Sequence, residues 1–253
     1  AKVLSTLDYR VPIIVDAAQQ WLLLSILGEN YPMWDFRVEN VDAIVADPHK
    51  TEASTYPGGF IAFRDSDYAL DTRMPNSYLC LDDPIGFDMR EVMQQLPQMS
   101  TSRSALGAIS TWAYLLMNGR ASLKEKYRRN VGIVKKIADY IRSSRNYSLL
   151  CEPQTTVVPF HTKDMDDAKA HEIYNKVITS KEEPRFYIGF SDSMRIFTYS
   201  DLLEYGARKR TQYTHKINGH GGLYIQIMPH LTDYLADVLI GRLDRYGEEI
   251  RKA

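Results

Sequence analysis

The chain has 253 residues, of which 44% are hydrophobic and 25% are charged, as expected for a globular protein that can bury a sizeable core. Its 31 basic and 32 acidic side chains nearly cancel, which argues against a nucleic-acid partner. The longest apolar run, residues 21–27, is too short to cross a bilayer. The only two cysteines, Cys80 and Cys151, favour a reducing, cytoplasmic location in which both are core residues.

The first part of the chain alternates apolar runs with polar loops. Residues 11–15, VPIIV, form a β-branched run typical of a strand buried on both faces, and Asp16 follows at its C-terminal end. A short buried helix or loop is expected over 20–27, followed by strands within 41–47 and 58–65. Because polar residues stand where successive strands end, we predict an α/β sheet with a site at the carboxyl ends of its strands.

A long irregular stretch and two helices follow. Residues 70–100 are polar and contain prolines, which is typical of a functional or mobile loop. The segment 100–119 begins with serine and threonine N-cap candidates and stops at Gly119, so we predict a helix there. The segment 122–144 has apolar residues at helical spacing and predicts a second, amphipathic helix.

The last part of the chain predicts a separate α+β domain, so we expect domains at 1–120 and 121–253. Its apolar and β-branched runs predict strands within 147–153, 155–161, 185–190 and 222–228, and its helical patterns lie at 164–179 and 231–252. The histidines of the segment 215–222, HKINGHGG, lack a cysteine or carboxylate at ligand spacing. We therefore expect a turn before a strand there, and no metal site.

Two residues of opposite charge follow successive predicted strands. Asp16 ends the first strand, and Lys50 lies in the loop DPHK after the second, just before the turn YPGG. A carboxylate at the end of a buried strand is costly unless a cation pairs with it. Lys50 is one candidate for that cation, which would make a structural ion pair, and an organic cation bound between the two residues is the alternative.

Three segments resemble, in order, the group II decarboxylases that depend on pyridoxal 5′-phosphate (PLP), which include aromatic amino-acid, tyrosine, histidine and glutamate decarboxylases. These segments are VDAA at 15–18, ADPHK at 46–50 and TSRSALGAISTWAYL at 101–115. The resemblance is collinear over about 13–127 and weaker beyond. It implies the aspartate-aminotransferase-like α/β fold (fold type I), with residues 1–120 as the C-terminal part of the PLP-binding large domain and 121–253 as the small domain.

The resemblance also implies partners. The family works as a homodimer with a shared active site, and its chains have a substantial N-terminal part before the DAA motif. Because this chain opens without methionine and as if in mid-domain, we expect it to be the C-terminal portion of a longer polypeptide. A small complete protein that has lost its initiator methionine is the alternative.

The resemblance assigns cofactor roles to four residues. Lys50 matches the lysine that bonds to the PLP aldehyde, and partial desolvation beside the cofactor is expected to lower the pKa of its amine. Asp16 matches the carboxylate that keeps the pyridine nitrogen protonated, so that the ring can accept electrons when the bond from Cα to the carboxylate breaks. Ala18 matches the small residue on one ring face. His49 matches a histidine that helps to hold the phosphate, and a loop histidine that caps a backbone group is the alternative.

Two further residues lie in and just after the long loop. Tyr78 matches a tyrosine that enters the neighbouring subunit's site and protonates Cα after carbon dioxide has left; an ordinary loop tyrosine is the alternative. Ser102 matches the segment that approaches the partner's cofactor phosphate, and the alternative is a plain helix N-cap. The residues QQW after DAA, and a C-terminal strand without arginine, depart from the family pattern.

The resemblance favours PLP-dependent decarboxylation of an L-amino acid to the amine and carbon dioxide, and Tyr78 favours an aromatic substrate. A retro-aldol lyase resembling the sphingosine-phosphate lyases uses the same cofactor on a different bond. A non-catalytic fragment or paralogue is the third possibility. No membrane partner is expected.

Overall fold

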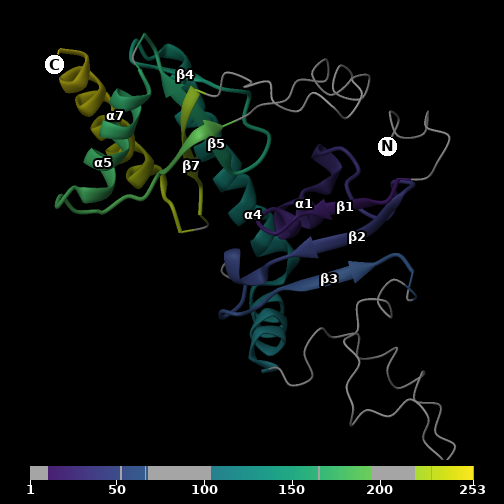
Figure 1. Ribbon diagram of the computed structural model, residues 1–253. Coiled ribbons are helices and arrows are strands. Elements are labelled where there is room, and N and C mark those ends of the chain that lie inside the picture. Colours follow the sequence, from purple (N-terminus) through teal and green to yellow (C-terminus); the bar gives the residue numbers. More distant parts are fainter. Residues whose placement is uncertain are drawn as a thin grey trace, which may run out of the picture. The chain divides into compact units, whose positions relative to one another are not determined.

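The computed structural model describes residues 11–51, 53–65, 67, 104–164, 166–194, 220–228 and 230–252. The chain divides into two compact units, Ala1–Lys124 and Glu125–Ala253 (Figure 1). The boundary expected after residue 120 lies near this division, and the assignment of the units to a large and a small domain stays a prediction. Within the described ranges, no helix is both long enough and apolar enough to cross a membrane.

The first unit contains a three-stranded sheet in the order β1-β2-β3, and its strands are drawn side by side in Figure 1. The strands are β1 (Ile13–Asp16), β2 (Val41–Ala46) and β3 (Phe60–Phe63). β1 is parallel to β2, whereas β3 is antiparallel to β2. The helix α1 (Trp21–Ile26) follows β1 and buries Leu22, Leu23 and Ile26, so the predicted strands and short helix of this part are confirmed.

The prediction that the first strand is buried on both faces is wrong. Side chains of β1 alternate, with Ile13 and Val15 packed against the core and Ile14 66% exposed. Within the described residues β1 has a sheet neighbour on one side only, which is β2. An edge strand covered on one face shows this alternation, whereas the central strand β2 is buried along nearly its whole length.

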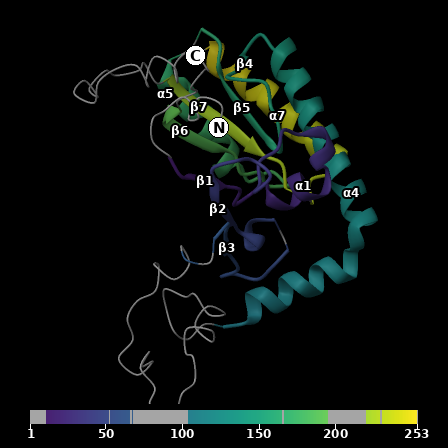
Figure 2. The same cartoon turned by 90° about the vertical axis from the view of Figure 1, so that its right-hand side faces the viewer.

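The long helix α4 (Leu106–Ser143) is interrupted at Gly119 (Figure 2). Gly119 has φ 65° and ψ 164°, a backbone conformation that side-chain-bearing residues rarely adopt and that glycine adopts readily. The two helices predicted from the sequence, with the first ending at Gly119, are therefore confirmed. In the second helix, the predicted apolar face is buried at Ile133, Ile137 and Ile141.

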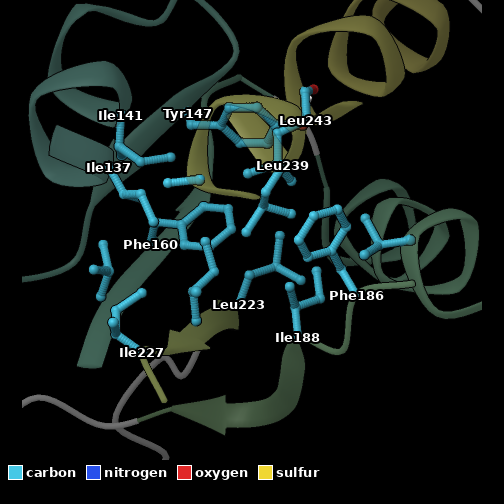
Figure 3. Packing of buried hydrophobic residues seen from close by; sticks show 14 of the residues in the cluster. Ile137, Ile141, Tyr147, Phe160, Phe186, Ile188, Leu223, Ile227, Leu239 and Leu243 are labelled. Atoms are coloured by element: carbon cyan, nitrogen blue, oxygen red, sulfur yellow. Dashed lines mark hydrogen bonds between the residues drawn. The ribbon is translucent and has the colours of Figure 1, made fainter. Parts of the chain in front are cut away.

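The second unit is the α+β structure that the sequence predicts. Its strands β4 (Tyr147–Leu149), β5 (Val157–Thr162), β6 (Gly189–Met194) and β7 (His220–Gln226) form an antiparallel sheet in the order β4-β5-β7-β6. The helices α5 (Asp167–Thr179) and α7 (Asp233–Lys252) contact each other, and α5 also contacts the sheet. Figure 3 shows its core, in which Phe160 lies near Tyr147 of the sheet and near Leu239 and Leu243 of α7.

Two expectations for this unit are wrong in detail. The strand expected over 185–190 begins only at Gly189, and Phe186 and Ile188 are buried in the core from the loop that precedes it (Figure 3). Cys151 was expected in the core, but it is exposed in the turn after β4. Apolar composition alone therefore does not distinguish a strand from a buried loop in this region.

Candidate active site

The carboxyl ends of β1 and β2 lie at the same edge of the sheet because the two strands are parallel. Asp16 is paired in register with Val45, near the end of β2. The loops that follow the strands are also joined: the Ala17 N–H donates to the Val45 carbonyl at 2.9 Å, and the Asp47 N–H donates to the Ala18 carbonyl at 3.1 Å. The residues after β1 and those before Lys50 are thus held together by backbone hydrogen bonds.

The charged partner of Lys50 is Asp47 and not Asp16. Nζ of Lys50 lies 2.7 Å from Oδ2 of Asp47, which stands three residues earlier in the same loop. The Lys50 side chain is 42% exposed, and that of Asp47 is 19% exposed. Oδ1 of Asp16 instead accepts a hydrogen bond from the Ala18 N–H at 3.0 Å. The ion pair considered between Asp16 and Lys50 is therefore not a direct contact in this structure.

The pKa of Lys50 is raised, which is opposite to the direction expected from desolvation beside a cofactor. The largest cause is the hydrogen bond of its ammonium group to Asp47, and the negative charges of Asp47 and Asp16 act in the same direction. Desolvation is the second-largest cause and opposes the shift, but it is smaller than the effect of the hydrogen bond. The contribution of Asp16 is a through-space interaction between the two strand ends.

Asp47 is the site residue that the sequence reasoning missed. Its carboxylate occupies space beside Gly59: a Cβ placed on Gly59 would lie 2.6 Å from Oδ1 of Asp47. The sequence carried a sign of this arrangement, because Asp47 precedes Lys50 by three residues in DPHK, and the turn Pro48–Lys50 is a single 3₁₀ turn. In such a turn residues three apart lie on the same side of the backbone.

His49 holds the loop that contains Lys50. Its Nδ1 lies 2.6 Å from the Gly58 carbonyl oxygen, and its ring packs edge-on against Tyr56 with ring centres 5.0 Å apart. The Gly58 N–H also lies 3.3 Å from Nδ1, so this ring nitrogen is engaged by the backbone of Gly58. This is the backbone-capping contact considered for His49. A phosphate contact would use Nε2 and stays a prediction.

The first turn of α4 supports the same loop. Oγ of Ser54 lies 3.1 Å from Oγ of Ser110, and the Thr55 N–H donates to Oγ of Ser110 at 3.2 Å. Gly107 meets the loop backbone directly, because a Cβ placed on it would lie 2.6 Å from the Pro57 carbonyl oxygen. The loop after Lys50 therefore rests on the N-terminal turn of a long helix.

The residues at this edge fit PLP by their chemistry. An amine (Lys50) matches an aldehyde, a carboxylate (Asp16) matches a protonated pyridine nitrogen, and the buried Ala18 next to Asp16 presents a small side chain. The charge of Asp16 also contributes to the raised pKa of Lys50. Tyr78 and Ser102, the other predicted site residues, lie outside the described residues.

Comparison with known proteins identifies relatives of this arrangement. The pyridoxal-dependent decarboxylase conserved domain matches residues 2–163. A probable L-tyrosine/L-aspartate decarboxylase of Methanothermobacter thermautotrophicus is 27% identical over 158 residues, which are 61% of this chain and 40% of the relative. Other curated relatives with similar coverage are named as L-aspartate decarboxylases. The chain thus spans about 40% of the length of these relatives.

Solved structures show the same fold. The TDC of Oryza sativa, solved with PLP and tryptamine, superposes with a TM-score of 0.69 at 17% identity over 98% of this chain and 46% of that one. A sphingosine-1-phosphate lyase of Burkholderia pseudomallei superposes with a TM-score of 0.62 at 19% identity over 94% of this chain and 45% of that one. The expected α/β fold of type I is therefore confirmed. Since the conserved domain matches more than half of the chain, the protein belongs to the pyridoxal-dependent decarboxylase family.

Proposed function

We propose that this chain forms part of a PLP-dependent enzyme that removes the carboxyl group of an L-amino acid and releases the amine and carbon dioxide. The observation that carries the proposal is the placement of Asp16 and Lys50 at one edge of the sheet by two parallel strands whose loops are hydrogen-bonded to each other. The membership of the decarboxylase family supports the same reaction.

Three of the described residues would hold the ring and the aldehyde of the cofactor, while His49 and Ser102 stay the predicted phosphate contacts, Ser102 toward the partner's cofactor. Lys50 would bond to its aldehyde, Asp16 would keep a proton on its ring nitrogen, and Ala18 would pack beside the ring. When bound, PLP supplies an electron sink for the pair of electrons left on Cα. Asp16 suits its role because the hydrogen bond that its carboxylate accepts from the Ala18 N–H orients the side chain.

The fold alone does not choose which bond breaks. Both the TDC of Oryza sativa and the sphingosine-1-phosphate lyase share it at similar TM-scores, so a retro-aldol lyase is the second candidate. Decarboxylation is favoured because the curated sequence relatives are named as decarboxylases. The substrates in these names are L-tyrosine and L-aspartate. An aromatic substrate is our first choice, since Tyr78 resembles the loop tyrosine of the aromatic enzymes, and L-aspartate is the competitor.

The proposed enzyme is a cytoplasmic homodimer with an active site shared between subunits, and it includes a segment N-terminal to this chain. An exposed apolar face on the first half of α4 is consistent with a partner. Its members are Leu106, Ile109, Trp112 and Leu116, which recur at helical spacing and are each more than half exposed. Equilibrium sedimentation of the full-length protein tests the dimer.

Reductive labelling tests the function. The full-length protein is incubated with PLP, reduced with borohydride and digested, and labelled peptides are mapped by mass spectrometry. The label is expected on Lys50, and carbon dioxide release is expected from carboxyl-labelled L-tyrosine or L-aspartate. Lys50→Ala should lose both signals, whereas Lys124→Ala, a change at a lysine paired with Glu29, should keep both. A label on another lysine contradicts the proposal, and a label on Lys50 without carbon dioxide from any amino acid indicates the lyase or the non-catalytic alternative.

A further inference from the structure

We propose that Asp47 is a positioning residue for Lys50: its carboxylate holds the lysine amine at the carboxyl edge of the sheet as an ammonium ion and thereby sets the pH at which the amine becomes nucleophilic. This inference rests on the proposed function in that Lys50 is taken to bond to the cofactor. Asp47 lies outside the set of residues to which the family resemblance assigns a role.

The geometry of the turn fixes Asp47 more firmly than Lys50. The Asp47 carbonyl accepts the Lys50 N–H at 2.9 Å, and the Asp47 N–H donates to Ala18, so its backbone is bonded on both sides. Its side chain is 19% exposed, against 42% for Lys50. The carboxylate is thus the stationary partner of the pair, and the long lysine side chain is the one that can leave it.

Gly59 leaves room for the Asp47 carboxylate. Any side chain at position 59 would begin 2.6 Å from Oδ1 of Asp47, closer than two such atoms can approach. Gly59 adjoins Gly58, whose carbonyl is bound by His49. The Asp47 carboxylate therefore lies beside Gly59 on one side and beside the Lys50 amine on the other.

The charged groups that face Lys50 in the described residues are both carboxylates. Asp47 pairs with it directly, and Asp16 acts on it from the end of β1. The neighbouring His49 directs Nδ1 to Gly58 and packs its ring on Tyr56. Both carboxylates favour the ammonium form, and an amine attacks a carbonyl carbon only after it has lost that proton.

The pH profile of Lys50 acylation tests this role without any cofactor. Protein purified without PLP is labelled with a trace of acetic anhydride at a series of pH values, and the acetylation of each lysine is measured by mass spectrometry. In Asp47→Asn the midpoint for Lys50 should move to lower pH. Its labelling below the midpoint should rise about 1.5- to 5-fold, the range expected for an exposed ion pair.

Two further variants make the test specific. Gly59→Ala should shift the Lys50 profile in the same direction by displacing the carboxylate. The control is an ion pair within the second unit, in which Nζ of Lys176 lies 3.0 Å from Oε2 of Glu249 and the hydrogen bond to Glu249 raises the pKa of Lys176. Glu249→Gln removes this partner and should shift only the labelling profile of Lys176. Circular dichroism shows whether each variant is folded. If Asp47→Asn does not fold, Gly59→Ala provides the test.

The results separate this inference from the proposed function. An unchanged Lys50 profile in the folded Asp47→Asn or Gly59→Ala variant overturns the role of Asp47. If the profile shifts but PLP and borohydride label another lysine, the role of Asp47 in holding Lys50 stands and the cofactor assignment fails. If both hold, Asp47→Asn should also form the borohydride-trapped PLP adduct faster at neutral pH than the wild-type protein does, because more of its Lys50 is neutral.

Discussion

The Asp47 N–H donates a hydrogen bond to the Ala18 carbonyl at 3.1 Å, and this contact joins the two loops that carry the candidate cofactor residues. Ala18 is two residues beyond Asp16, and its own N–H is bound by the Asp16 carboxylate at 3.0 Å. Asp47 in turn holds Lys50. A continuous series of contacts thus runs from the proposed ring-nitrogen partner to the proposed aldehyde partner, so the separation of the two is set by short-range interactions.

Asp16→Asn separates the charge of this residue from its structural contact. The amide keeps an oxygen that can accept the Ala18 N–H, so folding and trapping of PLP on Lys50 should persist. Turnover is expected to fall by orders of magnitude, because the neutral amide no longer keeps the ring nitrogen protonated. Carbon dioxide release and borohydride labelling should be measured on the same sample. Near-normal turnover would show that Asp16 is only structural.

Gly107→Ala should destabilise the first unit, although alanine is the better helix former. The added Cβ would lie 2.6 Å from the Pro57 carbonyl and 2.9 Å from Cα of Gly58, and these are backbone atoms that must move. Gly132→Ala is the matched control, since a Cβ there meets nothing within 4 Å and should stabilise the helix by about 0.5–1 kcal/mol. Thermal unfolding measures both effects, and hydrogen exchange over 53–59 reports the local effect of Gly107→Ala. Equal stabilisation by the two substitutions would contradict the close contact.

Tyr78→Phe tests the expected proton donor, which lies outside the described residues. If Tyr78 protonates Cα, the variant should still bind substrate and release carbon dioxide. The amine should form about 10²–10⁴-fold more slowly, the usual contribution of a general acid, and oxidation by oxygen to an aldehyde should compete. Amine, aldehyde and carbon dioxide should be measured together. The same product ratio and rate as in the wild type would assign the proton to another residue.

The second unit should lose stability in alkali because of buried tyrosines. The Tyr147 hydroxyl donates to the Leu243 carbonyl at 2.8 Å, and burial is the main cause that raises its pKa above the ordinary value near 10. Since the folded state holds the proton more tightly than the unfolded chain, this stability is complete below about pH 10 and is lost as the pH rises above it.

The matching substitution is Tyr147→Phe. It should cost about 0.5–1.5 kcal/mol at neutral pH through the lost hydrogen bond, but it should weaken the decline in stability above pH 10. A residual decline should remain, because burial also raises the pKa of Tyr140. Urea unfolding at a series of pH values provides the measurement, with the exposed Tyr187→Phe as control. An unaltered alkaline slope in Tyr147→Phe would assign the pH dependence to other groups.

The sequence by itself determined the local elements of this protein and the positions of its charged residues along the chain. The end of a helix at Gly119 followed from glycine chemistry, and the buried face of Ile133, Ile137 and Ile141 followed from helical spacing. The parallel arrangement of strands that brings Asp16 and Lys50 to one edge followed from polar residues at successive strand ends. The first two properties depend on residues close together in sequence or on a repeating pattern, whereas the third follows from the general rule that sites of α/β sheets lie at the carboxyl ends of the strands.

Only the tertiary structure decided which groups touch. Lys50 forms an ion pair with Asp47, while the Asp16 carboxylate accepts a hydrogen bond from the Ala18 N–H. The ring of His49 contacts the Gly58 carbonyl. The tertiary structure also exposed Ile14, because β1 pairs only with β2 among the described residues, and it buried Phe186 outside a strand. Burial and side-chain pairing depend on what the rest of the chain places beside a residue. The local pattern that predicts a strand or a loop does not contain that information.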